Sequence, residues 1–255
     1  MCRPVVHGNG HLALSAADWA RRSSIPVNAK LLKPTIAATG LLLRPVVGLS
    51  GLRVSTVELT KLPGPGEARA LSAGTSAETG PVQLAHWLAQ NLSERLTLPI
   101  DSACARSGVA GPMVSALSGL QHRITLLNTN SEATLDRQAH PQAAWARWRQ
   151  AGFRTALDGW GAGPLDLNPW LSEGYDEIWT DERMADRLPG PLSPRRGLAM
   201  DLFWALSRHG LTLVLRGVCQ PGQLATAREY GFAAVCGPLL GSPMPLRDYL
   251  RVRAP

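Results

Sequence analysis

Short apolar runs alternate along the chain with longer segments in which apolar residues recur every three or four positions. Short runs rich in Val, Leu, Ile and Thr are typical of strands. The sequence contains eight such runs, at residues 41–47, 53–59, 95–100, 123–128, 154–158, 177–181, 211–217 and 233–237. The pattern therefore predicts eight strands spread over most of the chain.

The segments with helical spacing lie between these runs. The clearest are residues 81–93, 141–152, 196–210 and 221–231, and the last three end at a glycine, as helix C-termini commonly do. A repeated strand-helix order predicts an α/β fold, either a closed barrel or an open sheet. We expect residues 31–255 to form one domain, with the Gly- and Pro-rich stretch at 62–81 as a long loop, and residues 1–30 to form a partly ordered extension.

The charge balance narrows the choice of partners. Lys and Arg number 26 against 19 Asp and Glu, which gives a net charge of +7. This excess favours either an anionic partner or a solvated arginine-rich surface, and the scattered arginines argue against nucleic acid. No apolar stretch approaches the roughly 18 residues of a membrane span, and the start lacks a secretory signal. We therefore expect a cytoplasmic protein with no membrane partner.

The cysteines and histidines show no metal-binding pattern. The four cysteines, Cys2, Cys104, Cys219 and Cys236, form no C-x-x-C pair, and the six histidines are dispersed. This spacing argues against a zinc site. Cys219 and Cys236 fall at the ends of neighbouring predicted strands, so they form either a disulfide or two thiols, and a reducing cytoplasm favours thiols.

Four segments resemble motifs of a single family. "AGFRTALDGWGAGPLDL" (151–167) is similar to a segment with the pattern A-[IL]-D-D-F-G-T-G, and "YDEIWTDERMADRL" (175–188) to one with K-[IL]-D. "LVLRGVCQPGQLATAREYGFAAVCGPLLGSPMP" (213–245) resembles the stretch from E-G-V-E to Q-G-Y, and "LLLRPVVGLSGLRVSTVELTKL" (41–62) a strand pair that ends in E-A-L. Together, in this order, they resemble the EAL domain, the family of bacterial cyclic di-GMP phosphodiesterases.

The resemblance implies a TIM-like (β/α)8 barrel with one reversed strand, and an active site at the C-terminal strand ends. It also implies that carboxylates and an asparagine hold two divalent cations there. Four remnants of that site are expected at Glu58, Asp101, Asp158 and Asp181. The first three retain oxygen donors and are the only candidates for a metal site, but we expect neither a bound metal nor another cofactor.

Several positions of the implied active site carry unsuitable residues. A glutamate is replaced by Leu127, or by Asn128 if the alignment shifts by one. The other substituted positions are Gly159 for the second aspartate of D-D, Trp179 for the lysine, and Arg216 and Cys219 for the two glutamates of E-G-V-E. Because oriented charges and metals commonly contribute several kcal/mol each, these losses predict a pseudoenzyme without phosphodiesterase activity.

The reversed charge at Arg216 suggests how the old site stays stable. Without metals, Glu58, Asp101 and Asp158 would repel one another in a partly enclosed cup. We hypothesise that Arg216 lies among them and replaces the metal electrostatically. The alternative is that Arg216 points to solvent and the acids are simply hydrated.

The positions that would contact a nucleotide have also changed. If the chain is a receptor, the resemblance places Arg44, Lys61, Arg216 and Cys236 at the ligand. We favour a degenerate EAL-like domain that acts as a regulatory or protein-interaction module. A non-hydrolysing cyclic di-GMP receptor is the alternative, followed by residual metal-dependent hydrolysis.

The tryptophans leave two questions open. Trp160 and Trp170 lie in the loop that the resemblance links to a dimer interface, where they either anchor a protein partner or brace the loop from within. A homodimer is therefore possible. Trp145 and Trp148 lie three residues apart on one predicted helix, so they either cover the core or form an exposed stripe.

Overall fold

A computed structural model describes residues 41–61, 81–101, 105, 114–129, 142–162 and 174–253. The extension at 1–30, the loop from 62 to 80, Cys2, Cys104 and Trp170 lie outside these ranges. The backbones of Lys61 and Asp101 are described, but their side chains are not. Within the described ranges, no helix is long and apolar enough to cross a membrane.

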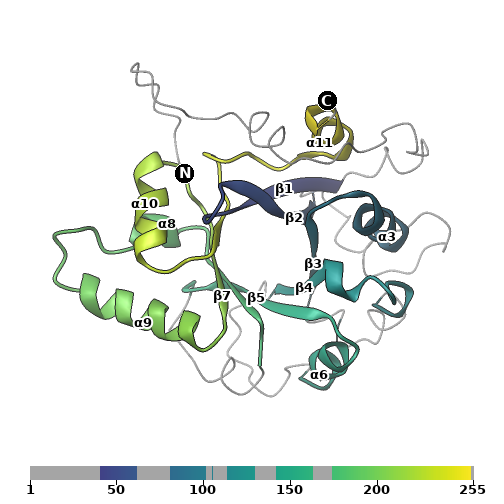
Figure 1. The fold of residues 1–255 in the computed structure, drawn as a ribbon, viewed down its shortest axis with the longest axis horizontal. Coiled ribbons are helices and arrows are strands. Elements are labelled where there is room, and N and C mark those ends of the chain that lie inside the picture. The colour runs from purple at the N-terminus through teal and green to yellow at the C-terminus, as the bar shows by residue number, and fades with distance from the viewer. Residues whose placement is uncertain are drawn as a thin grey trace.

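Eight strands close into a barrel (Figure 1). They are β1 (Leu41–Gly48), β2 (Arg53–Lys61), β3 (Arg95–Asp101), β4 (Ile124–Thr129), β5 (Arg154–Trp160), β6 (Glu177–Thr180), β7 (Thr212–Leu215) and β8 (Ala234–Val235). Neighbours from β2 to β8 run parallel, whereas β1 is antiparallel to both β2 and β8 and closes the ring. The predicted TIM-like barrel with one reversed strand is confirmed.

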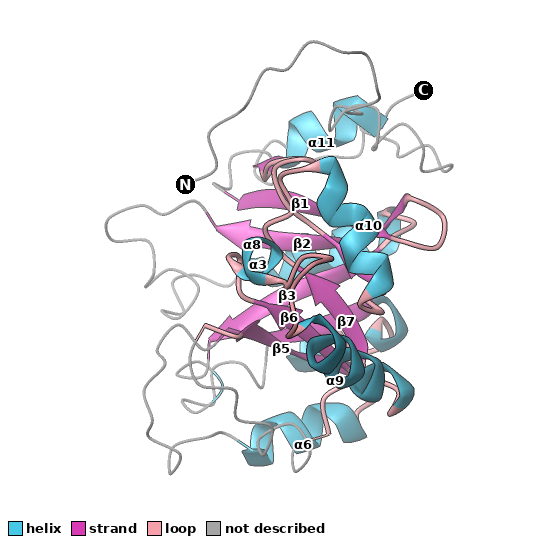
Figure 2. Cartoon of the chain, turned by 90° about the vertical axis from the view of Figure 1, so that its left-hand side faces the viewer, coloured by secondary structure: helices cyan, strands magenta, loops and turns pink. Residues whose placement is uncertain are grey.

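Helices pack around the outside of the barrel (Figures 1 and 2). The four predicted helices appear as α3 (Pro81–Asn91), α6 (Gln142–Gln150), α9 (Arg196–Arg208) and α10 (Pro221–Glu229). The pattern did not predict the short α8 (Met184–Arg187), the 3-10 turn η3 (Gln121–Arg123), α11 (Leu246–Arg253) or β9 (Met244–Pro245), which pairs with β1.

Alternation along each strand separates two apolar layers. Inward residues fill the middle of the barrel: Val46, Leu127, Ala156, Trp179, Val214, Ala234 and Cys236. Outward residues pack against the helices, and Trp145 and Trp148 of α6 belong to this outer layer, with ring centroids 4.8 Å apart. Both tryptophans are buried, which confirms that they cover the core.

A bulge in β5 changes which way its side chains point. Leu157 pairs with Ile178 and Trp160 with Thr180, so Asp158 and Gly159 together oppose the single residue between those partners. Gly159 has a φ of +74°, a conformation that glycine adopts without strain. Asp158 faces the barrel mouth as the alternation from Ala156 requires, and the extra residue after it turns Trp160 into the outer layer.

Candidate functional site

An arginine lies between two carboxylates at the mouth formed by the C-terminal strand ends. Arg216 follows β7 directly, Glu58 lies on β2 and Asp158 on β5. The Arg216 Nη2 is 2.6 Å from Glu58 Oε1, and its Nε is 3.2 Å from Asp158 Oδ1. The side chains of Arg216 and Glu58 are only 8% and 5% exposed. Arg216 therefore does not point to solvent, and it contacts two of the acids expected beside it.

A second layer of charge covers this pair from the solvent side. Arg44 on β1 pairs in register with Glu58, and its Nε lies 3.6 Å from Glu58 Oε2. Glu182, on the loop between β6 and α8, contacts Arg44 Nη1 and lies 3.3 Å from Arg216 Nη1. One half-exposed carboxylate thus links the two guanidinium groups across the mouth. We name this cluster of Arg44, Glu58, Asp158, Glu182 and Arg216 the mouth cluster.

The loop that carries Glu182 is held against the end of β7 by a close backbone contact. Gly217 has a φ of +79°, and a Cβ atom added there would lie 1.8 Å from the Glu182 carbonyl oxygen. Only glycine permits this approach. The glycine after Arg216 therefore lets the chain bring Glu182 over the cluster.

Trp179 forms the floor beneath Arg216. The Arg216 Cζ lies 5.0 Å from the centroid of the Trp179 ring, within the range of a cation–π contact. The indole N–H donates to Glu177 Oε2 at 3.0 Å, and Thr125 Oγ1 and Arg154 Nε both lie 3.2 Å from Glu177 Oε1. Trp179, in place of the lysine implied by the resemblance, thus connects the mouth to a polar network deeper in the barrel.

The protonation of the cluster reflects burial and mutual charge. Burial raises the pKa of Asp158 to about 6, although Arg216 lowers it, and the negative charge of Glu58 raises it further. Burial lowers the pKa of Arg216, but the neighbouring acidic groups, chiefly Glu58 and Asp158, together raise it by more, so it ends above its ordinary value. Burial raises the pKa of Cys236 to about 12, which keeps this thiol protonated.

Three residues with expected roles in the site lie apart from the cluster. Asp181 follows β6, and its Oδ1 accepts a hydrogen bond from the Arg183 backbone, so it organises the turn into α8. Cys219 lies at the start of α10, where its backbone N–H donates to Gln223 Oε1. Leu127 is buried in the middle of the barrel. Cys219 and Cys236 form no disulfide, which confirms the expectation of thiols.

Two of the three candidate metal ligands, Glu58 and Asp158, have side chains that the structure describes, and both contact Arg216. Both Glu58 oxygens face arginines, and Asp158 Oδ1 accepts the Gly159 backbone N–H while lying beside Arg216. Within the described ranges, no three His, Cys, Asp or Glu residues are placed to hold a metal together. A cation that used Glu58, or the Oδ1 of Asp158, would therefore have to displace an ion pair with Arg216.

Trp160 cannot serve as an exposed anchor for a partner. It is buried and meets Phe203 of α9 edge to face, with ring centroids 5.2 Å apart. The bulge at Asp158 and Gly159 turns its side chain toward this outer layer. Of the two alternatives for Trp160, the structure contradicts the partner-binding role and places it as a brace.

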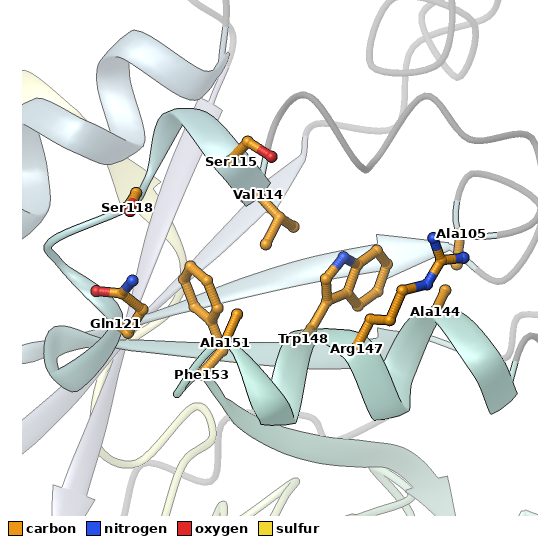
Figure 3. A pocket seen from close by; sticks show the side chains of 10 residues that line it. All are labelled: Ala105, Val114, Ser115, Ser118, Gln121, Ala144, Arg147, Trp148, Ala151 and Phe153. Carbon is orange, nitrogen blue, oxygen red and sulfur yellow. The ribbon is translucent and has the colours of Figure 1, made fainter.

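A cavity of about 440 Å³ lies away from the mouth, between α6 and the residues that precede β4 (Figure 3). Val114, Trp148 and Phe153 line its apolar side, and Arg147 and Gln121 supply polar groups. No residue of the mouth cluster lines it. The cavity and the mouth are therefore separate features.

The chain is thus a TIM-like barrel with one reversed strand, and it carries a charged cluster at the C-terminal strand ends. The EAL domain family model matches residues 78–243, about two thirds of the chain. The chain belongs to the EAL domain family. A comparison with curated proteins gives no match.

Several solved structures share the fold. Klebsiella pneumoniae BlrP1, in a complex with calcium and cyclic di-GMP, has a TM-score of 0.65 and 16% identity over 84% of this chain and 58% of that chain. The PaMucR phosphodiesterase complex with cyclic di-GMP has a TM-score of 0.63 and 19% identity, over 82% and 97%. The EAL domain of Mycobacterium smegmatis DcpA has a TM-score of 0.61 and 18% identity, over 88% and 100%. The chain thus spans less than two thirds of the BlrP1 chain.

Proposed function

We propose that this chain is a degenerate, catalytically silent EAL domain that acts as a regulatory or protein-interaction module. The observation that carries the proposal is the position of Arg216, whose guanidinium contacts both Glu58 and Asp158. A permanent cation of the protein itself holds these acids together. In this proposal, Arg216 takes over the electrostatic role that the resemblance assigns to metals.

The remaining side chains support the loss of hydrolysis. Cleavage of a phosphodiester needs an activated water and stabilisation of charge as it develops. The two guanidinium groups at the mouth are already neutralised by Glu58 and Glu182, and Trp179 cannot exchange a proton. Each of these features alone would weaken catalysis, and they occur together.

A cyclic di-GMP receptor is the second candidate. BlrP1 and PaMucR are both complexes with this nucleotide, and the mouth of this chain holds two arginines that a phosphate could contact. Glu182 is half exposed, so it is the carboxylate that a phosphate would replace. The cost of breaking its contacts with Arg44 and Arg216 makes us favour the interaction module.

The test is incubation of the full chain with cyclic di-GMP and Mg²⁺ or Mn²⁺, followed by chromatography for the linear product, with PaMucR as the positive control. We expect no product above the protein-free blank. Metal-dependent product would overturn the proposal. In a parallel calorimetric titration, saturable binding that strengthens in Glu182→Ala would establish the receptor instead.

A further inference from the structure

The three large apolar side chains that are exposed, among the described residues, all lie in one short segment. They are Leu192, Leu198 and Trp204, and the first two are 99% and 78% exposed. The position of Trp204 has a structural explanation, because its indole N–H donates to the Glu229 carbonyl oxygen. Leu192 lies in the connection between α8 and α9, and Leu198 lies in the first turn of α9. This connection projects away from the barrel in Figure 1.

The backbone that presents these leucines is fixed by hydrogen bonds. The Ser193 N–H donates to the Gly190 carbonyl at 3.0 Å, and the Arg196 N–H to the Ser193 carbonyl at 3.1 Å. These contacts form two consecutive turns, and Leu192 lies at the tip of the first. We name residues 189–198 the α8–α9 turn.

The α8–α9 turn is also tied to α10 at both ends. The Tyr230 hydroxyl donates to the Pro189 carbonyl at 2.7 Å, and Arg196 Nη2 lies 2.6 Å from Glu229 Oε2. An apolar side chain on an anchored backbone loses less conformational entropy on binding than one on a loose loop. The exposed leucines are therefore pre-organised for contact.

The charge of the segment restricts the partner. From residue 187 to residue 200 the sequence has three arginines and no acidic residue. Arg196 pairs with Glu229, whereas Arg195 is exposed and lies between the two leucines in the sequence. A membrane surface would need a broader amphipathic face, and a nucleic acid would need stacking side chains. A protein surface with an apolar pocket rimmed by carboxylates complements this pattern.

We infer that the α8–α9 turn is the partner-binding surface of this chain, with Leu192 inserting into an apolar pocket of a second protein and Arg195 pairing with an acidic residue at its rim. This inference rests on the proposed role as an interaction module and names its contact surface. It requires no contribution from the mouth cluster.

The test uses a photocrosslinking amino acid in the full chain, produced in its native host, at position 192, at 198, or at the exposed control position 151. We expect a discrete product with a different protein from positions 192 and 198, and none from 151. Leu192→Ser should abolish the product formed from 198, and Arg195→Glu should reduce the product formed from 192. Unchanged thermal unfolding of both variants serves as the folding control.

The captured protein is then purified and titrated directly. Leu192→Ser should weaken its affinity by about tenfold or more, as expected for a central apolar anchor, and Arg195→Glu should weaken it more than Arg195→Lys. The inference would be overturned if no crosslinked product forms, if the product contains two copies of this chain, or if the products do not depend on Leu192. It would also be overturned if the chain captures no protein and sediments with anionic vesicles instead. None of these outcomes alters the hydrolysis result, so the proposed function fails separately, through formation of linear product.

Discussion

The guanidinium of Arg216 lies 2.6 Å from the carboxylate of Glu58, although the two residues are 158 positions apart in the sequence. Both side chains are almost completely buried, and Asp158 and Glu182 also face this guanidinium. Burial of charge costs free energy unless each group is paired. The stability of the barrel mouth should therefore depend on this contact.

Removal of the cation should destabilise the protein strongly. Arg216→Met leaves Asp158 without a guanidinium partner and Glu58 with only the longer contact to Arg44. Breaking a buried pair costs about 3–5 kcal/mol. We expect a loss of this size in the free energy of unfolding, measured with urea at pH 7.5. The exposed Arg208→Met serves as the control and should cost less than about 0.5 kcal/mol.

The same contact predicts a coupling between the two positions. Arg216→Met combined with Glu58→Gln should be less destabilised than the sum of the single variants, by about 0.5–3 kcal/mol. Additive effects would show that Arg216 and Glu58 contribute independently, contrary to the ion pair.

The raised pKa of Asp158 gives a pH dependence with an unusual sign. An aspartate whose pKa is about 6 in the folded state and about 3.9 when unfolded disfavours folding at neutral pH, and this effect disappears as the pH falls from 6 toward 4. Asp158→Asn should therefore be more stable than the wild type at pH 7.5, by about 2 kcal/mol. The difference should shrink at pH 5. Urea denaturation of both proteins at the two pH values measures it, and a difference that grows in acid would contradict the assignment.

The free energy of unfolding should depend on the indole nitrogen of Trp179, which lies at the floor of the mouth. Trp179→Phe keeps an aromatic ring below Arg216 but removes the donor to Glu177, which leaves a buried carboxylate oxygen without that hydrogen bond. We expect a cost of about 1–3 kcal/mol in the free energy of unfolding. Trp204→Phe removes an indole donor at a more exposed position and should cost less.

Two glycines with positive φ should differ sharply in their tolerance of alanine. At Gly217 a Cβ would collide with the Glu182 carbonyl oxygen, whereas at Gly159 no atom lies within 4 Å of it. Gly159→Ala should cost about 1–2 kcal/mol from backbone strain alone, and Gly217→Ala should cost about 3 kcal/mol or more because overpacking adds to strain. Equal costs in thermal unfolding would exclude the close approach of the Glu182 loop.

Most of the fold could be predicted from the sequence because buried strands carry a strong local pattern. All eight strands and the four longer helices follow from apolar periodicity. The one-turn α8 could not be predicted in this way, since a helical pattern needs more residues than it contains. Strand β9 consists of Met244 and Pro245, and a proline argues against a strand in the sequence. Helix α11, of eight residues, was also missed.

The site was predicted less completely, because motifs identify positions and not neighbours. Arg216 was expected among the acids, but Glu182 and Glu177 fall between the motif positions and were missed. Alternation offered a signal for Glu177, which shares the inward face of β6 with Trp179. No local signal marks Glu182, whose place depends on the tertiary contact of its loop with Gly217.

A calorimetric titration of the full chain with Mn²⁺ measures whether guanidinium groups of the chain occupy the charge sites at the barrel mouth. We predict no saturable heat at neutral pH, because Glu58 and Asp158 are engaged by Arg216. Saturable submillimolar binding of one or two Mn²⁺ ions per chain, abolished by Asp158→Asn, would show that Arg216 does not take the place of a metal.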